Sequence, residues 1–188
     1  MRKGIIINEL NKLTFNYFRD NLMPEYDVIS ILWTKENEQL LQKVLLLSPS
    51  KINIRGSLDH EFFRFCNVVR PKSVTIEGSG DYRLEYSFGL DVLKYKGLLM
   101  EFLGSIGCEG CHGVCTDFRH ENVLHSGDAG ASFVEMEVRD YDANRDYYRD
   151  AIEVAAMRDM KVRVSGDTSS IIGDLGDSAI DLVYENIQ

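Results

Sequence analysis

Four short apolar segments recur at a nearly constant spacing in the first 80 residues, and this spacing constrains the fold more than any other feature of the sequence. Each has the core of a β-strand, and the cores begin at Ile5, Ile29, Ile52 and Val74. The successive spacings are 24, 23 and 22 residues. Helix-like segments lie between the cores, at residues 10–22, 36–47 and 59–69. Strand–helix–strand units of this length predict parallel strands with right-handed crossovers.

The period leaves two fold interpretations open. The first is an α/β protein with a mostly parallel sheet built from strand–helix units of about 22–24 residues. The second is a short solenoid, because leucine-rich repeats have a period in the same range. The leucine and asparagine ladder of such repeats is absent, so we favour the α/β sheet. Two of the strand cores also end alike, in Ile54-Arg55-Gly56-Ser57 and Ile76-Glu77-Gly78-Ser79.

The second half of the chain continues the alternation less regularly. We expect strands at residues 82–88, 132–138 and 162–164, and helices at residues 92–106, 144–160 and 170–187. The organisation predicted from these elements is a single α/β domain over residues 1–188. Its parts are regular strand–helix units at 1–90, a loop containing Cys and His at 107–131, and an irregular acidic strand–helix region at 132–188.

The composition is that of a globular protein with a sizeable core. Hydrophobic residues make up 44% of the chain, and no apolar run approaches the 18 residues of a membrane span. The N-terminal apolar stretch has only three residues before Asn8 and Glu9, which is too short for a signal peptide. We therefore expect a cytoplasmic protein that does not act at a membrane.

The net charge of −9 is concentrated in the last third of the chain. Residues 1–125 hold 15 Lys and Arg against 16 Asp and Glu, whereas residues 126–188 hold 6 against 14. Nucleic acid is an unfavourable partner for such a chain because phosphate contacts need clustered Lys and Arg. The complement of an acidic face is a basic protein or a cation.

An acidic ridge is expected on the last predicted helix. Its residues are spaced three, four and four apart, and they are Asp174, Asp177, Asp181 and Glu185. Three more carboxylates at the start of the preceding helix, Asp140, Asp142 and Asp146, would extend the same surface. The alternative to a partner-binding ridge is an ordinary solvated helix face.

A short segment concentrates the chain's Cys and His residues. Six of the eight lie between positions 108 and 125. Zinc binding is one interpretation of this segment. The residues proposed to bind the metal are Cys108, Cys111, Cys115 and His120, with His125 as an alternative to His120. The Cys-x-x-Cys-His string also matches the motif for covalent haem attachment. An iron–sulfur cluster is a further alternative, in which Cys66 would be the fourth ligand beside the three cysteines of this segment. A structural role without any metal is the remaining interpretation.

The sequence contains no P-loop and no Gly-x-Gly-x-x-Gly motif, and no catalytic constellation stands out. The leading hypothesis is therefore a non-enzymatic acidic binding protein, an immunity- or antitoxin-like inhibitor that neutralises or regulates a basic protein partner. The alternative is a zinc-binding or cysteine-dependent enzyme or sensor that uses residues 108–125. No cofactor is expected other than zinc. The sequence does not determine the oligomeric state.

Overall fold

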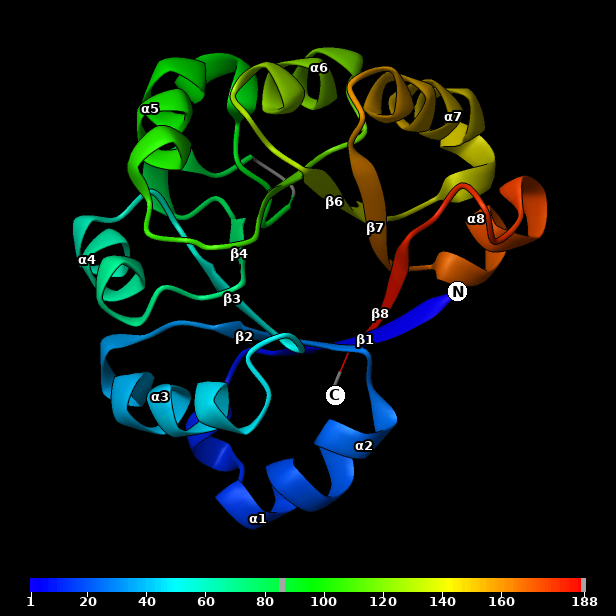
Figure 1. Cartoon of the computed structure of the whole chain (residues 1–188). Coiled ribbons are helices and arrows are strands. Elements are labelled where there is room, and N and C mark those ends of the chain that lie inside the picture. The colour runs from blue at the N-terminus through cyan, green and yellow to red at the C-terminus, as the bar shows by residue number, and fades with distance from the viewer. Residues whose placement is uncertain (85–86, 187–188) are drawn as a thin grey trace.

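Eight parallel strands close into a barrel in the computed structural model, which describes residues 1–84 and 87–186 (Figure 1). The strands are β1 (Arg2–Ile7), β2 (Val28–Leu32), β3 (Ile52–Gly56), β4 (Ser73–Ile76), β5 (Cys111–Thr116), β6 (Phe133–Val138), β7 (Lys161–Gly166) and β8 (Leu182–Asn186). Each strand pairs with the next in chain order, and β1 pairs with β8 to complete the ring. This is the TIM-barrel architecture.

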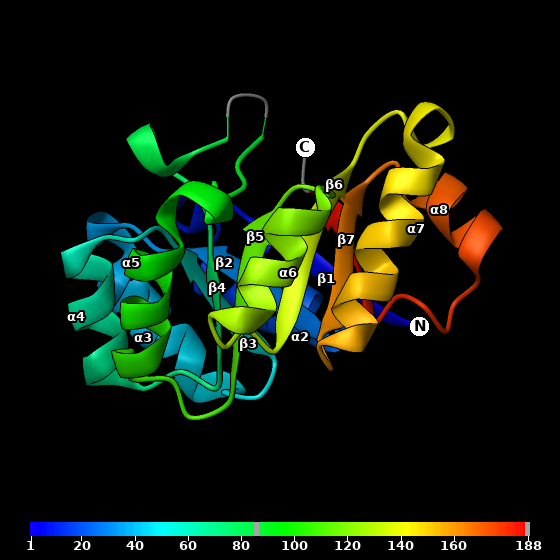
Figure 2. The same ribbon diagram turned by 90° about the horizontal axis from the view of Figure 1, so that it is seen from above.

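Helices follow each of the first seven strands and surround the barrel (Figures 1 and 2). The α-helices are α1 (Phe15–Tyr17), α2 (Met23–Glu25), α3 (Glu38–Leu47), α4 (His60–Val69), α5 (Val92–Ser105), α6 (His120–Asp128), α7 (Tyr141–Met157) and α8 (Thr168–Leu175). Short 3-10 turns occur at Leu10–Lys12, Lys35–Asn37 and Gly80–Tyr82, and a π-helical turn at Phe18–Leu22 joins α1 to α2. None of the helices formed by the described residues is long and apolar enough to cross a membrane.

The main hydrophobic core lies between the barrel and its helices. Alternate residues of each strand point outward, because side chains alternate between the two faces of a strand. Most of the outward residues are apolar and fully buried, as are Ile29, Ile54, Ile76 and Val134. They pack against the inner faces of the helices in one continuous cluster.

The inward-facing residues are unusually polar for a barrel of this type. TIM-barrel interiors are commonly filled by branched apolar side chains. Here the buried polar and charged residues of the strands include Ser30, Asn53, Arg55, Ser73, Thr75, Glu135 and Arg163. A small separate apolar cluster inside the barrel consists of Val28, Leu182 and Tyr184. The barrel is therefore held together by apolar packing outside and largely by hydrogen bonds inside.

The predicted α/β class and the mostly parallel strand–helix units are confirmed. The closure of the strands into a barrel was not expected, and it replaces both the open sheet and the solenoid. The closure follows from the pairing of Arg2 with Leu182 at opposite ends of the chain. A local sequence pattern does not report such a contact.

Several of the expected elements are wrong. The predicted loop at 107–131 contains both β5 and α6. Residues 10–22 form a series of short helical turns in place of one helix. The predicted strand at 82–88 includes residues 85 and 86, which lie outside the described residues. Of its other residues, Arg83 forms only an isolated antiparallel bridge with Leu90.

The predicted helix at 170–187 is also wrong, and with it the acidic ridge. Helix α8 ends at Leu175, the next residue Gly176 has a φ of 75°, and the chain then enters β8. A positive φ favours glycine and stops a helix. The four acidic residues therefore lie on a helix, a turn and a strand, and they share no common face.

Candidate functional site

A cavity of about 390 Å³ opens at the C-terminal ends of the strands. The described residues that line it are Ile6, Asn8, Leu32, Arg55, Glu77, Ser87, Phe88, Gly89, Cys115, Thr116, Glu135, Glu137 and Ser165. Asn8 and Glu77 directly follow β1 and β4, and Thr116 is the last residue of β5. Described parts of the connection from β4 to α5 rise at this end of the barrel (Figure 2). TIM-barrel enzymes place their active sites at this face.

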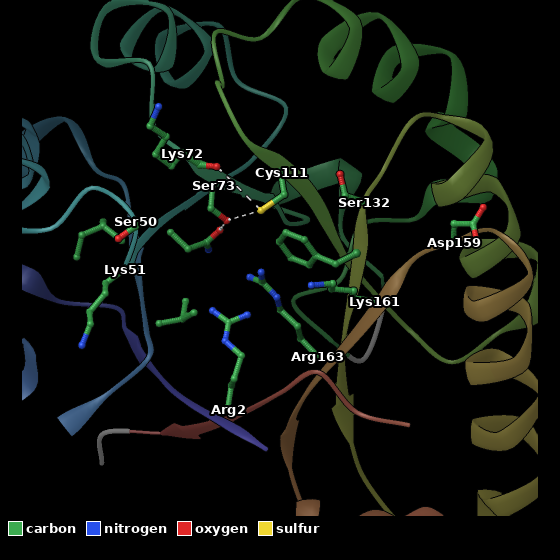
Figure 3. Close-up of a pocket in the computed structure, with 14 residues that line it drawn as sticks. Arg2, Ser50, Lys51, Lys72, Ser73, Cys111, Ser132, Asp159, Lys161 and Arg163 are labelled. Atoms are coloured by element: carbon green, nitrogen blue, oxygen red, sulfur yellow. Dashed lines mark hydrogen bonds between the residues drawn. The ribbon is translucent and has the colours of Figure 1, made fainter. Parts of the chain in front are cut away.

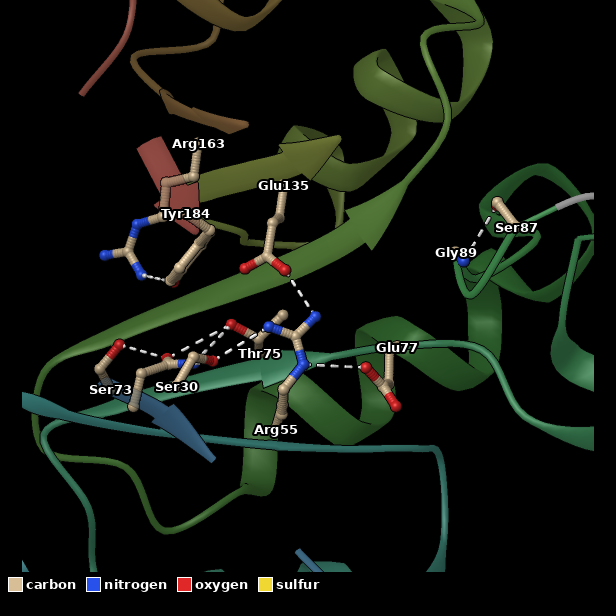
Figure 4. Close-up of polar contacts among 11 residues, drawn as sticks. Ser30, Arg55, Ser73, Thr75, Glu77, Ser87, Gly89, Glu135, Arg163 and Tyr184 are labelled. Carbon is tan, nitrogen blue, oxygen red and sulfur yellow. Dashed lines mark hydrogen bonds and ion pairs between the residues drawn. The ribbon is translucent and has the colours of Figure 1, made fainter. Parts of the chain in front are cut away.

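Arg55 is the centre of the polar arrangement under this cavity (Figure 4). Its Nη2 donates to Glu135 Oε1 at 2.5 Å, its Nε donates to Glu77 Oε2 at 3.0 Å, and its Nη1 donates to Ser30 Oγ at 3.0 Å. The Arg55 side chain is 4% exposed and that of Glu135 is 2% exposed. Burial opposes the charge on Arg55, but the attraction of Glu135 and Glu77 outweighs it and raises the pKa of Arg55 well above its usual range. The guanidinium is thus a permanently charged group.

Glu135 presents one carboxylate oxygen without a partner. Oε1 accepts the hydrogen bond from Arg55, whereas Oε2 is buried and has no hydrogen-bond partner among the described residues. A buried polar atom of this kind costs free energy unless something pairs with it. The Glu135 side chain lines the cavity, and in Figure 4 its unpaired oxygen points away from Glu77 and Ser87, toward Tyr184 in the barrel interior.

A chain of hydrogen bonds runs from this site through the barrel interior. Ser30 Oγ, which accepts from Arg55, also accepts from Asn53 Nδ2 at 2.7 Å. Asn53 Nδ2 donates to Thr75 Oγ1 at 2.9 Å, and Asn53 Oδ1 accepts from Ser73 Oγ at 2.6 Å. The chain fixes the Arg55 side chain from below, and Arg55 in turn orients Glu135.

A second carboxylate, Glu137, stands at the rim of the cavity. It follows Glu135 by two residues on β6, so both side chains point to the same face of the strand. Arg139 Nη2 donates to both of its oxygens, at 2.8 and 2.7 Å. Glu137 is 32% exposed, so it is open to solvent where Glu135 is not.

Cys115 is the one proposed zinc ligand that lines this cavity. Burial, followed by the charge of Glu135, raises the pKa of its thiol well above the usual range. The thiolate is the nucleophilic form of cysteine. Cys115 is therefore a protonated side chain of the barrel interior at neutral pH.

The other proposed zinc ligands lie elsewhere. Cys108 Sγ is 3.5 Å from the carbonyl oxygen of Cys111, and Cys111 Sγ is 3.5 Å from Ser73 Oγ at the N-terminal end of the barrel. His120 is on the outside, where its Nδ1 lies 3.0 Å from Asp150 Oδ2. No group of three or more His, Cys, Asp or Glu side chains that could hold a metal ion occurs within residues 1–84 and 87–186. The four residues are thus not brought together into one site.

The proposed partner-binding acids are dispersed, and several are paired within the molecule. Asp174 accepts from Tyr141 and Arg149, and Glu185 pairs with Lys3 and Tyr26. Of the rest, Asp142 pairs with Arg145, Asp181 pairs with Arg2, Asp140 precedes α7, and Asp146 and Asp177 are exposed. A basic protein partner stays a prediction, without a continuous acidic face to bind it.

No protein-family model matches the chain, and no curated protein matches it in sequence. Solved structures do match it in three dimensions. The tryptophan synthase A-subunit from Pyrococcus furiosus superposes with a TM-score of 0.67 at 10% identity, over 98% of this chain and 85% of that one. The fold is shared with enzymes.

Two further matches are aldolases. An HpcH/HpaI aldolase/citrate lyase family protein from Burkholderia cenocepacia gives a TM-score of 0.62 at 8% identity, over 98% of this chain and 87% of that one. QR15, described as an aldolase, gives 0.61 at 10% identity, over 98% and 89%. At these identities the comparisons show a common fold.

The prediction of a non-enzymatic immunity- or antitoxin-like inhibitor is wrong. It rested on the negative charge after residue 125 and on the lack of a catalytic motif, and the structures that share the fold include tryptophan synthase subunits and aldolases. The lack of a recognisable motif misled the interpretation, because TIM-barrel sites are assembled from single residues at the ends of different strands.

Of the residues that line this site, only Cys115 was among the predicted site residues, although the sequence contains a signal for two others. Arg55 and Glu77 occupy the same place in two matched strand endings, 22 residues apart. In parallel strands of one barrel such positions are neighbours, and the two side chains form an ion pair at 3.0 Å. Charged residues at matched positions of successive strand ends are thus a usable indication of a site.

Proposed function

We propose that the chain is an aldolase-like enzyme that moves a proton next to a carbonyl group of a small substrate. The observation that carries the proposal is Glu135, a buried carboxylate that lines the cavity with one oxygen held by Arg55 and the other unpaired. The position of the cavity at the C-terminal face of the barrel supports it, as does the fold shared with aldolases.

In this proposal Glu135 is the general base. For cleavage of a β-hydroxy carbonyl compound, the Glu135 carboxylate takes the proton of the hydroxyl group, and the electrons of the hydroxyl oxygen form a new carbonyl. The carbon–carbon bond breaks, and its electron pair passes to the second fragment as an enolate. Return of the proton from Glu135 to the enolate carbon completes the reaction. Atoms and electrons balance without a further reactant.

Arg55 supplies positive charge beside the developing enolate. A guanidinium has five N–H groups, of which the described hydrogen bonds use three. The remaining two are available to an oxyanion of the substrate. Of the described residues that line the cavity none is a lysine, so the proposed route is carboxylate-dependent and does not form an imine with the substrate.

Exchange of substrate protons with solvent deuterium tests this proposal directly. The protein is incubated in D₂O with small 2-keto acids and hydroxyketones, and loss of the α-proton signals is followed by NMR. We expect exchange with at least one of these compounds and a loss of about 100-fold or more in Glu135→Gln, consistent with the usual contribution of a general base. Glu121→Gln, an exposed carboxylate on α6, is the matched control and should leave the rate unchanged.

Equal exchange rates in the wild type and in folded Glu135→Gln, or no exchange with any of the compounds, would contradict the assignment. Circular dichroism establishes that the variant is folded. Gln retains a carbonyl oxygen that accepts from Arg55, so it removes the base and keeps the shape of the side chain.

We also infer a cytoplasmic location. The four cysteines are free thiols, and proteins keep their thiols reduced in the cytoplasm. Fractionation of cells with a compartment marker tests this, and recovery of the protein in an oxidising compartment would overturn it.

A further inference from the structure

A second cavity lies at the opposite, N-terminal end of the barrel. Its volume is about 300 Å³. Ser73, Cys111 and Phe133, the first residues of β4, β5 and β6, line it together with charged residues of β1 and β7. It is separate from the candidate active site, and the inference drawn from it does not depend on the proposed function.

Three cationic side chains converge in this cavity: Arg2, Lys161 and Arg163. Figure 3 shows their nitrogen atoms directed toward one another from β1 and β7. The other two cations of the lining turn away from this point. Lys51 Nζ donates to the carbonyl oxygens of Met23 and Tyr26, and Lys72 pairs with Glu109.

Arg163 is the strongest indication of a ligand. It is 4% exposed, and its Nε has no hydrogen-bond partner among the described residues. Its Nη1 donates to Tyr184 Oη at 3.3 Å, and its guanidinium stacks on the Phe133 ring at 3.5 Å. The aromatic ring thus holds the buried guanidinium in one orientation. A guanidinium in a fixed orientation is suited to bind a planar or tetrahedral oxyanion.

A single carboxylate, Asp181, lies among the three cations. It is 3.4 Å from Arg2 Nη1, 3.7 Å from Lys161 Nζ and 3.9 Å from Arg163 Nε. These separations exceed the 2.7–2.9 Å typical of a tight charged hydrogen bond. The cavity thus carries two more positive than negative charges at this point. Asp181 is not among the described residues that line the cavity, and the acid that does line it, Asp159, lies well to one side of the convergence in Figure 3.

We propose that this cavity binds a small doubly charged oxyanion of the phosphate class, either free phosphate or a phosphate monoester. Three cations against the single charge of Asp181 leave two positive charges, which match the charge of the ligand. The Ser73 hydroxyl lines the same space. The site would hold a ligand at the face opposite to the proposed chemistry.

Cys111 makes a local test possible, since it lines the cavity as a free, partly exposed thiol. Cys108→Ser removes the other accessible thiol, while Cys66 and Cys115 are buried. The rate at which uncharged iodoacetamide alkylates Cys111 is measured in phosphate and in chloride of equal ionic strength. We expect saturating phosphate to slow the reaction about fivefold or more.

Variants of the cations separate binding in the cavity from a general effect of salt. Arg163→Gln and Lys161→Gln should each weaken the apparent phosphate affinity about tenfold or more. Arg64→Gln, an exposed cation on α4 paired with Glu61, is the matched control and should keep the protection. Lys161 is 67% exposed, so Lys161→Gln carries the test if Arg163→Gln does not fold.

Absence of protection in the wild type, or equal protection in Lys161→Gln, would overturn the proposal and show an adventitious ion only. Glycerol phosphate distinguishes the two ligand sources. Stronger protection by glycerol phosphate than by phosphate identifies a monoester site, and weaker protection identifies a site for the free ion.

Discussion

Among single residues, Arg55 joins the two carboxylates of the candidate site to the hydrogen bonds of the barrel interior. It is buried with Glu135, touches Glu77 and is fixed by Ser30. Two carboxylates buried near one another would repel if the guanidinium were missing. The role of Arg55 is therefore structural as well as chemical, and the two contributions have different measurable effects.

Replacement of Arg55 by Met should destabilise the fold strongly. The change keeps much of the side-chain volume but leaves Glu135 buried without its counterion, which typically costs about 3–5 kcal/mol. Urea unfolding measures the loss. Arg145→Met, which breaks an exposed pair with Asp142, is the control and should cost less than about 1 kcal/mol.

The double variant Arg55→Met, Glu135→Gln should recover part of this loss, because it removes both members of the buried pair. A cost below about 1 kcal/mol for Arg55→Met alone would show that the network is not as desolvated as described.

The elements differ in how well the sequence predicts them, for physical reasons. The strands at 5–7, 29–31, 52–54 and 74–76 were predicted because apolar residues cover their outer face against the helices. Strand β5 was missed because its segment, Cys111–Thr116, contains a single large apolar residue, Val114. Its inward positions are Cys111, Gly113 and Cys115, so the segment lacks the alternation of apolar and polar residues that is typical of a strand.

Strand β8 was missed because a misleading helical pattern covered it. Acidic residues at 174, 177, 181 and 185 happen to follow helical spacing, and the pattern outweighed the β-branched and aromatic residues of Leu182–Asn186. The other strands also alternate polar with apolar residues, as in Ile52-Asn53-Ile54, and this pattern alone does not show which face is interior. Only closure of the barrel turns the polar face into an interior.

Gly113 on β5 provides a test of the interior packing. The Phe133 ring of the neighbouring strand occupies the place where a Cβ at Gly113 would lie. Gly113→Ala should therefore cost about 1–3 kcal/mol, the usual effect of overpacking. Gly104→Ala on α5 is the control, since nothing lies within 4 Å of its added carbon, and it should stabilise by up to about 1 kcal/mol.

Urea unfolding of the two variants gives the comparison. Adding Phe133→Leu to Gly113→Ala should restore part of the stability by freeing space. Equal stability of Gly113→Ala and Gly104→Ala would contradict the packing of Phe133 described above.

For the whole molecule, acid pH should weaken the fold through surface carboxylates. Hydrogen bonds from neighbouring side chains lower the pKa of five carboxyl groups, those of Asp20, Glu61, Glu109, Asp128 and Asp174. Since the folded pKa values lie below the unfolded ones, the unfolded chain binds more protons in acid. This contribution is complete above the unfolded values near pH 4 and is lost as the pH falls through the folded values.

The urea midpoint should accordingly fall between pH 7 and pH 3, and the fall should be smaller at high salt, which screens exposed pairs. A midpoint that does not change over this range would show that these pairs contribute nothing to stability.

The pairing of β1 with β8 has a consequence for how the chain is made. Of the eight barrel strands, β8 is synthesised after the other seven, and its partner β1 before them. A nascent chain on the ribosome can build strand–helix units as they emerge, but the second neighbour of β1 exists only after the other strands of the barrel have been made. During that interval the polar inner face is open to water, which satisfies its hydrogen bonds. The partly folded intermediate therefore exposes hydroxyl and carboxylate groups on this face. A barrel with an apolar interior would at the same stage expose a hydrophobic surface that is prone to aggregation.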